Sequence, residues 1–243
     1  MKYKLETIPV WDALKEDTEC PFCVLMEKAE SRYVQYYLGN SAMNPETRVE
    51  VNASGFCPEH FSKLLLARNP QHLGLIAHTH LQDWMTDLSR RSPAGGGRSL
   101  ARMVKKGGGP MSEYARHIEE RRETCLICDR IERTLKRYTF TTAWLWKKEE
   151  EGFRQALTES KGFCIPHAKS LLQMGDEILS PAEMAEFLSF VEDLQSRNLE
   201  RLEKEIHWFT QKFKSENHSK PWGTSEDAHY RVIQKLTGRR TPH

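Results

Sequence analysis

The chain has 243 residues, of which 38% are hydrophobic and 29% charged. Its 36 lysines and arginines nearly balance 34 acidic residues, so the net charge does not indicate a nucleic acid, a membrane surface or an acidic substrate as partner. This length allows a sizeable core in one large domain or two small ones.

The hydrophobic residues are spread along the chain. Residues 1–11 lack the apolar stretch of a signal peptide, and no segment approaches the ~20 apolar residues that span a bilayer. We therefore expect a cytoplasmic protein without a membrane partner.

The first chemically distinctive motifs are Cys20-Pro-Phe-Cys23 and Gly55-Phe56-Cys57-Pro-Glu-His60. Two cysteines three residues apart face the same point when the second lies in the first turn of a helix, where backbone N–H groups favour a thiolate. Proline directly after Cys57 is typical of a helix start. We expect both motifs to form helix N-termini and to bind one metal ion together.

The periodicity around these motifs is helical. Hydrophobic residues between positions 73 and 88 recur at steps of three and four, which predicts an amphipathic helix at the end of the first half. Strand-like alternation is almost absent, and residues 48–51 are the best short strand candidate. We therefore predict an all-α fold.

Residues 91–111 are rich in glycine and predict a linker. The basic residues in and beside this segment are Arg90, Arg91, Arg98, Arg102, Lys105 and Lys106. No acidic residue accompanies them, so a phosphate-bearing partner such as RNA could be attracted here. The residue order of a Walker-type phosphate loop is missing, and a solvated linker is the simpler interpretation.

The second half of the chain repeats the first. Cys125-Leu-Ile-Cys128 follows the first Cys-x-x-Cys motif at an offset of 105 residues, and Gly162-Phe163-Cys164-Ile-Pro-His167 follows the first Gly-Phe-Cys motif at an offset of 107. Leu64-Leu65 and Leu171-Leu172 match at the second offset. Such a pattern predicts one supersecondary unit used twice. The expected ranges are a first repeat at 1–90, a linker at 91–111, a second repeat at 112–215 and a tail at 216–243.

All six cysteines belong to these motifs, and each repeat adds one histidine. Three thiolates and one imidazole complete a tetrahedral zinc shell, so we predict two zinc ions. The expected ligand groups, one in each repeat, are Cys20, Cys23, Cys57 and His60, and Cys125, Cys128, Cys164 and His167. A closed shell indicates a structural ion rather than hydrolytic chemistry, and hence a protein without enzymatic activity.

Other uses of the cysteines remain open. Disulfides are typical of short secreted chains and would not need His60 or His167. A glutaredoxin-like dithiol at Cys20 and Cys23 would require βαβ alternation, which is absent from the pattern. An iron–sulfur cluster held by three cysteines and a histidine is chemically possible, although zinc is the more frequent occupant of such spacing.

The C-terminal third predicts a long helix and a structured tail. Apolar residues from position 184 to 213 recur at helical spacing and indicate one amphipathic helix that begins near Pro181. Before it, Trp144, Trp146, Tyr138 and Phe140 form an aromatic strip that suits core packing better than base stacking. In the tail, residues 226–236 predict a short docking helix, and residues 238–243 predict disorder.

The motifs together resemble a bacterial domain-of-unknown-function family from mainly anaerobic lineages. The resemblance is carried by the Cys-Pro-x-Cys and Gly-Phe-Cys-x-x-His motifs, the following Leu-Leu pair, Cys125 to Ile131, and a C-terminal Lys220-Pro-Trp-Gly223 segment. It covers most of the chain and supports the repeats and the metal sites. It implies no reaction or substrate.

We expect a zinc-stapled helical module that binds a protein partner. A metal-linked or thiol-based redox or sensor protein is the alternative, and an RNA-binding module that uses the basic linker is a second one.

Overall fold

The computed structural model describes residues 5–92, 110–149 and 151–238. Every regular element in these ranges is a helix, and they contain no β-strand, which confirms the all-α prediction. None of the described helices combines the length and the apolar character that crossing a membrane requires.

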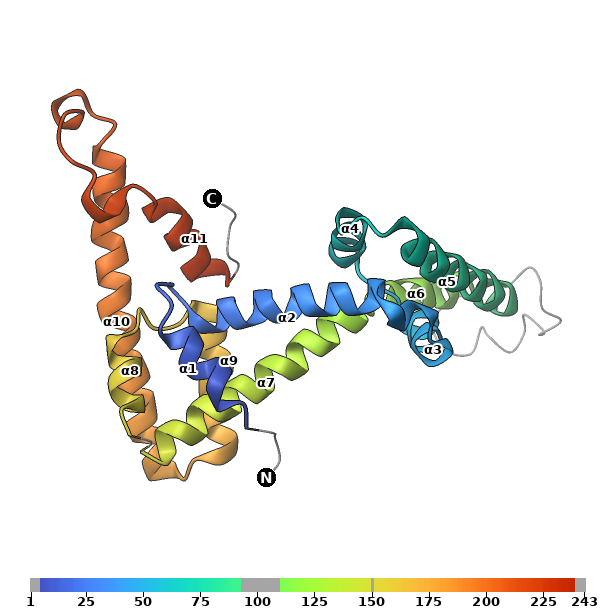
Figure 1. The fold of residues 1–243 in the computed structure, drawn as a ribbon, viewed down its shortest axis with the longest axis horizontal. Coiled ribbons are helices and arrows are strands. Elements are labelled where there is room, and N and C mark those ends of the chain that lie inside the picture. The colour runs from blue at the N-terminus through green and yellow to red at the C-terminus, as the bar shows by residue number, and fades with distance from the viewer. Residues whose placement is uncertain (1–4, 93–109, 150, 239–243) are drawn as a thin grey trace. The chain divides into compact units, whose positions relative to one another are not determined.

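The helices are joined mostly by short connections (Figure 1). The predicted linker falls almost entirely on residues 93–109, outside the described ranges, and stays a prediction. The elements are α1 (Thr7–Leu14), α2 (Pro21–Leu38), η1 (Asn40–Met43), α3 (Pro45–Ser54), α4 (Pro58–Leu66), α5 (Pro70–Arg91), α6 (Pro110–Arg122), α7 (Leu126–Lys147), α8 (Phe153–Glu159), α9 (Ile165–Ile178), α10 (Pro181–Gln211), η4 (Ser215–Asn217), η5 (Gly223–Ser225) and α11 (Ala228–Thr237).

The chain forms two compact units. Unit 1 comprises residues 1–29 and 132–243, and unit 2 comprises residues 30–131. Both boundaries fall inside a helix, one in α2 and one in α7. Each unit therefore contains segments from both sequence repeats, and this division differs from the ranges expected from the repeats.

Unit 1 is built around α10, on which α9 and α11 pack (Figure 1). Ser180 and Glu183 form a capping box at the start of α10, and Pro181 occupies its first turn, which explains why the long helix begins where the sequence predicts. The aromatic strip packs in the core as expected: Trp146 is 1% exposed, and its ring lies 4.8 Å from that of Phe187.

The tail returns to α10. Trp222 packs its ring 5.6 Å from that of Phe209, and the buried amine of Lys212 donates hydrogen bonds to the carbonyls of Asn217 and His218 at 3.0 and 2.9 Å. The predicted terminal helix is confirmed as α11. Residues 239–243 lie outside the described ranges.

Unit 2 packs α3 and α4 against α5. Its core includes Tyr37, Phe56, Leu64, Ile76 and Ile127. The short strand candidate at residues 48–51 lies inside α3. The N-cap side chain of Asn44 accepts a hydrogen bond from the Glu46 amide at 2.9 Å, and this start signal outweighs a short β-like alternation.

Candidate metal centres

Four helix N-termini carry the cysteine and histidine motifs. Helix α2 begins directly after Cys20 and α7 directly after Cys125, while Cys57 and Cys164 are the N-cap residues of α4 and α9. The second ligand of each motif therefore lies in the first helical turn, as predicted. Unpaired backbone N–H groups at these positions favour negatively charged thiolates.

The glycine of each Gly-Phe-Cys motif allows the chain to enter α4 or α9. Gly55 has φ +65° and Gly162 has φ +72°, a region that favours glycine. A Cβ atom on Gly55 would lie 2.8 Å from the His80 ring, and one on Gly162 would lie 2.6 Å from Oε1 of Gln195. The repeated glycine is thus required by both backbone conformation and space.

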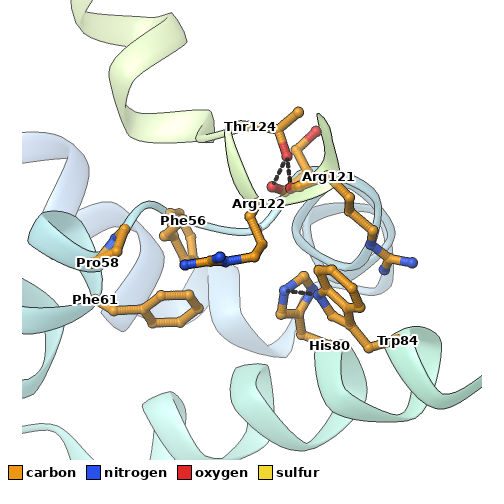
Figure 2. A pocket seen from close by; sticks show the side chains of 10 residues that line it. Phe56, Pro58, Phe61, His80, Trp84, Arg121, Arg122 and Thr124 are labelled. Atoms are coloured by element: carbon orange, nitrogen blue, oxygen red, sulfur yellow. Dashed lines mark hydrogen bonds between the residues drawn. The ribbon is translucent and has the colours of Figure 1, made fainter. Parts of the chain in front are cut away.

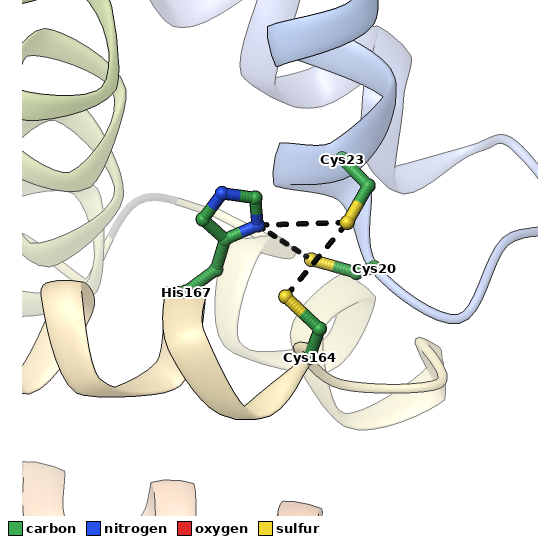
Figure 3. A group of neighbouring side chains, drawn as sticks. All are labelled: Cys20, Cys23, Cys164 and His167. Atoms are coloured by element: carbon green, nitrogen blue, oxygen red, sulfur yellow. Dashed lines mark hydrogen bonds between the residues drawn. The ribbon is translucent and has the colours of Figure 1, made fainter. Parts of the chain in front are cut away.

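Site 1 lies within unit 1 and consists of Cys20, Cys23, Cys164 and His167. Figure 3 shows the three sulfurs and the histidine Nδ1 facing one point. The Nδ1 atom lies 3.4 Å from the Cys20 sulfur and 3.6 Å from the Cys23 sulfur, which in turn lies 3.7 Å from the Cys164 sulfur. All four residues are buried.

Site 2 lies within unit 2 and consists of Cys57, His60, Cys125 and Cys128. The Nδ1 atom of His60 lies 3.2, 3.3 and 3.4 Å from the sulfurs of Cys57, Cys125 and Cys128, respectively. The sulfurs of Cys57 and Cys128 are 3.9 Å apart. In contrast to site 1, Cys128 is exposed and Cys57 is partly exposed.

These distances fit one tetrahedral ion in each site. Zn–S bonds of ~2.3 Å and Zn–N bonds of ~2.0 Å place ligand atoms ~3.6–3.8 Å apart. In both sites the ligand atoms lie within 4.8 Å of one another. Disulfide bonding, in contrast, requires sulfurs ~2.05 Å apart, and all six cysteines are free. Both groups could therefore hold a metal ion.

The predicted partition of the eight ligands is wrong. The repeats predict that Cys20 and Cys23 share an ion with Cys57 and His60. The structure instead places the Cys-x-x-Cys motif of each repeat with the Cys-x-x-His motif of the other repeat. Each Cys3His group is complete, but neither sequence repeat supplies a whole shell.

The length of α2 explains the crossed pairing. This helix has 18 residues and hence extends ~27 Å, which carries the chain away from Cys23 before α3 and α4 form. Phe56, the neighbour of Cys57, packs its ring 4.9 Å from that of Tyr37 in the last turn of α2. Cys57 thus lies near the end of α2, whereas Cys23 lies in its first turn.

Within each site, neighbouring groups shift the pKa values of the thiols in opposite directions. In site 1, burial alone would raise the pKa of Cys20, but hydrogen bonds from the other ligands lower it, whereas bonding to Cys20 raises the pKa of Cys164 to about 12. In site 2, burial again opposes ionisation, while a hydrogen bond from His60 lowers the pKa of Cys125 to about 6. Burial and the neighbouring Cys125 raise the pKa of Cys128. A divalent ion would stabilise the thiolates whose ionisation these groups oppose.

A carboxylate orients the histidine of site 2. The Nε2 atom of His60 donates to Oε1 of Glu30 at 2.9 Å, and this would leave the Nδ1 lone pair to a metal ion bound among the three sulfurs. The hydrogen bond from His60, together with Lys63, lowers the pKa of Glu30 to about 2, so this carboxylate is charged at neutral pH. The repeat gives no signal for Glu30, because the matching position of the second repeat is Leu135.

We expect Glu30→Gln to weaken metal binding at site 2 by roughly 10–100-fold, because a neutral amide supports the histidine less well than a carboxylate does. A competition titration with a chromophoric chelator measures this. Glu59→Gln is the matched control, since Glu59 contacts the same Lys63 at 3.6 Å and leaves the Glu30–His60 bond in place. Equal affinities of the two variants would contradict the role of Glu30.

Site 1 has a buried cation instead. Lys235, 1% exposed, donates to the carbonyls of Glu19 and Lys161 at 2.9 and 2.5 Å. Burial lowers the pKa of Lys235, and the charges of Glu19, Cys20 and Cys164 oppose this shift. A divalent ion bound by three thiolates would carry one net negative charge, which a charged Lys235 would help to balance.

A small pocket of 230 Å³ in unit 2 lies beside α4 (Figure 2). Phe56 and Phe61 contribute apolar walls, and Arg122 extends toward both rings. At the other end, Trp84 donates to Nε2 of His80 at 3.0 Å, which fixes His80 as a structural group. Among the residues that line the pocket, no nucleophilic side chain is hydrogen-bonded to a base in the way that catalysis requires.

The basic residues proposed to bind RNA are only partly described. Arg90 and Arg91 end α5, and Arg91 pairs with Asp87 at 2.9 Å. Residues Arg98, Arg102, Lys105 and Lys106 lie outside the described ranges. RNA binding here stays a prediction.

The chain belongs to a family of unknown function, DUF6062, whose family model matches residues 1–243. This agrees with the resemblance to a domain-of-unknown-function family. No curated protein and no solved structure matches the chain.

Proposed function

We propose that the chain is a non-enzymatic zinc protein in which two structural ions hold a helical module for binding a partner protein. The observation that carries this proposal is the pair of complete four-ligand groups. Three thiolates and a histidine leave no coordination position for water or substrate, which is the arrangement of structural zinc sites.

A single ion suits the geometry better than an iron–sulfur cluster does. The ligand atoms of each site lie within 4.8 Å of one another, with nearest distances of 3.2–3.9 Å. A cluster of several iron and sulfide atoms would have to push the cysteine sulfurs much further apart. Zinc is therefore the favoured occupant on both geometry and ligand chemistry.

A partner-binding role is supported by exposed apolar side chains on α4, which carries a ligand of site 2, and on α5, which packs against α4. Leu65 and Leu66 at the end of α4 are 67% and 77% exposed. Leu81 and Met85 lie one turn apart on α5 and are 59% and 61% exposed. Exposed apolar groups of this kind on a rigid helical frame suit a protein partner.

The test is purification without oxygen, followed by elemental analysis and an absorption spectrum. We expect two zinc ions per chain and a colourless solution. Iron with sulfide and visible absorption would contradict zinc and would favour electron transfer or sensing. A salt-dependent affinity for single-stranded RNA, measured by fluorescence anisotropy, would favour the RNA alternative over the protein partner.

A further inference from the structure

The two metal centres differ in solvent access although their ligands are equivalent. Cys20 and Cys164 of site 1 are fully buried, and Cys23 is 3% exposed. In site 2 only Cys125 is buried among the cysteines, while Cys57 is partly exposed and Cys128 is exposed. The same chain therefore holds a shielded and an accessible copy of one thiolate site.

The cover over site 1 comes from the end of α11. The Cys23 sulfur lies 3.3 Å from the Gly238 carbonyl oxygen, and a Cβ atom on Gly238 would lie 3.3 Å from the Cys164 sulfur. The backbone thus closes directly over two of the sulfurs. At site 2 the exposed Cys128 sulfur lies 3.9 Å from the partly exposed Cys57 sulfur, so the two accessible thiolates are neighbours.

We infer that site 2 is a reactive thiolate centre at which hydrogen peroxide converts Cys57 and Cys128 to a disulfide and releases the metal ion, while site 1 keeps its ion. This inference rests on the proposed zinc occupancy. Susceptibility to oxidants follows thiolate character and exposure. Cys128 is the exposed cysteine of site 2, and a bound zinc ion would hold it as a thiolate.

The chemistry balances with peroxide as the oxidant. The Cys128 thiolate attacks one peroxide oxygen, so that an S–O bond forms, the O–O bond breaks and hydroxide leaves. The Cys57 thiolate then attacks the sulfenic sulfur, the S–S bond forms and a second hydroxide leaves. Two thiolates lose two electrons, peroxide gains them, and two solvent protons convert the hydroxides to water.

The metal ion is released because its shell is broken. After disulfide formation only Cys125 and His60 remain as ligands, and two ligands do not complete a zinc shell. The sulfurs of Cys57 and Cys128 must approach from 3.9 Å to ~2.05 Å, a movement that departure of the ion allows. The zinc ion itself changes no oxidation state.

The test follows zinc release from the full-length, zinc-loaded protein with a chromogenic indicator after addition of hydrogen peroxide. We expect one of the two ions to leave at a rate about tenfold or more above that of the other. Peptide mapping under non-reducing conditions should find Cys57 joined to Cys128, with Cys20, Cys23 and Cys164 still reduced.

Cys128→His is the matched variant, because it keeps four ligands and removes the exposed thiolate. We expect it to retain two zinc ions and to lose the fast phase of release.

Release of both ions at the same rate, or a disulfide that excludes Cys57 or Cys128, would overturn the inference even when two zinc ions are present. A protein purified without zinc would instead overturn the proposed function, and peptide mapping would still decide whether these two cysteines react first. If Cys128→His fails to fold, the two release phases and the peptide map of the natural chain decide the matter.

Discussion

Replacing Cys164 by alanine is expected to remove the metal ion from site 1 and to unfold much of unit 1. Cys164 is fully buried and begins α9, so its loss leaves two buried thiols and a histidine without their shared ion. The apparent binding energy of structural zinc in small peptides is ~10–16 kcal/mol, comparable with the ~5–15 kcal/mol that stabilises a whole domain.

Elemental analysis and a thermal melt followed by circular dichroism measure this effect. The metal content should fall from two ions to one. The part of the unfolding curve at lower temperature should shift to a still lower temperature. Ser170→Ala, a partly exposed position on the same helix, should change neither quantity. An unchanged melt of Cys164→Ala would show that site 1 does not stabilise the fold.

Replacing Glu19 by alanine is expected to cost roughly 3–5 kcal/mol of unfolding free energy, because it leaves the buried Lys235 and the partly buried Arg201 and Arg231 without their carboxylate partner. The Glu19 side chain is 1% exposed. Three basic groups meet its carboxylate, at N–O distances of 2.6 Å for Arg201, 3.3 Å for Arg231 and 3.7 Å for Lys235. The next residue is the metal ligand Cys20, so this network also fixes the start of α2.

Chemical unfolding in urea, with metal content checked in parallel, measures the loss. Glu132→Ala is the matched control in unit 1, since Glu132 pairs with Lys136 on the exposed side of α7 at 2.8 Å. Exposed helix pairs of this kind contribute about 0.3–0.5 kcal/mol. Equal losses in the two variants would mean that the buried network around Glu19 adds no special stability.

The features predictable from the sequence are those set by neighbouring residues. The helix starts at the cysteine motifs, the long helix after Pro181 and the Gly-Phe-Cys turns all depend on residues within a few positions of one another. The composition of the ligand groups was predictable for the same reason, since the repeat places three cysteines and one histidine in each half.

The features that could not be predicted depend on contacts between distant segments. Which Cys-x-x-Cys motif meets which Cys-x-x-His motif is decided by how far α2 carries the chain, and the two pairings have the same sequence signature. The sequence repeat does not mark Glu30 or Lys235, because each supports one site only. The different exposure of Cys23 and Cys128 is likewise invisible in the repeat.

Each ion is shared between the two repeats, and the metal content of two double variants tests this arrangement. After dialysis against a chelator, Cys20→Ala/Cys164→Ala should retain one ion, because both changes fall in site 1. Cys20→Ala/Cys57→Ala should retain none, because the changes fall in different sites. One ion in the second variant and none in the first would contradict the crossed arrangement.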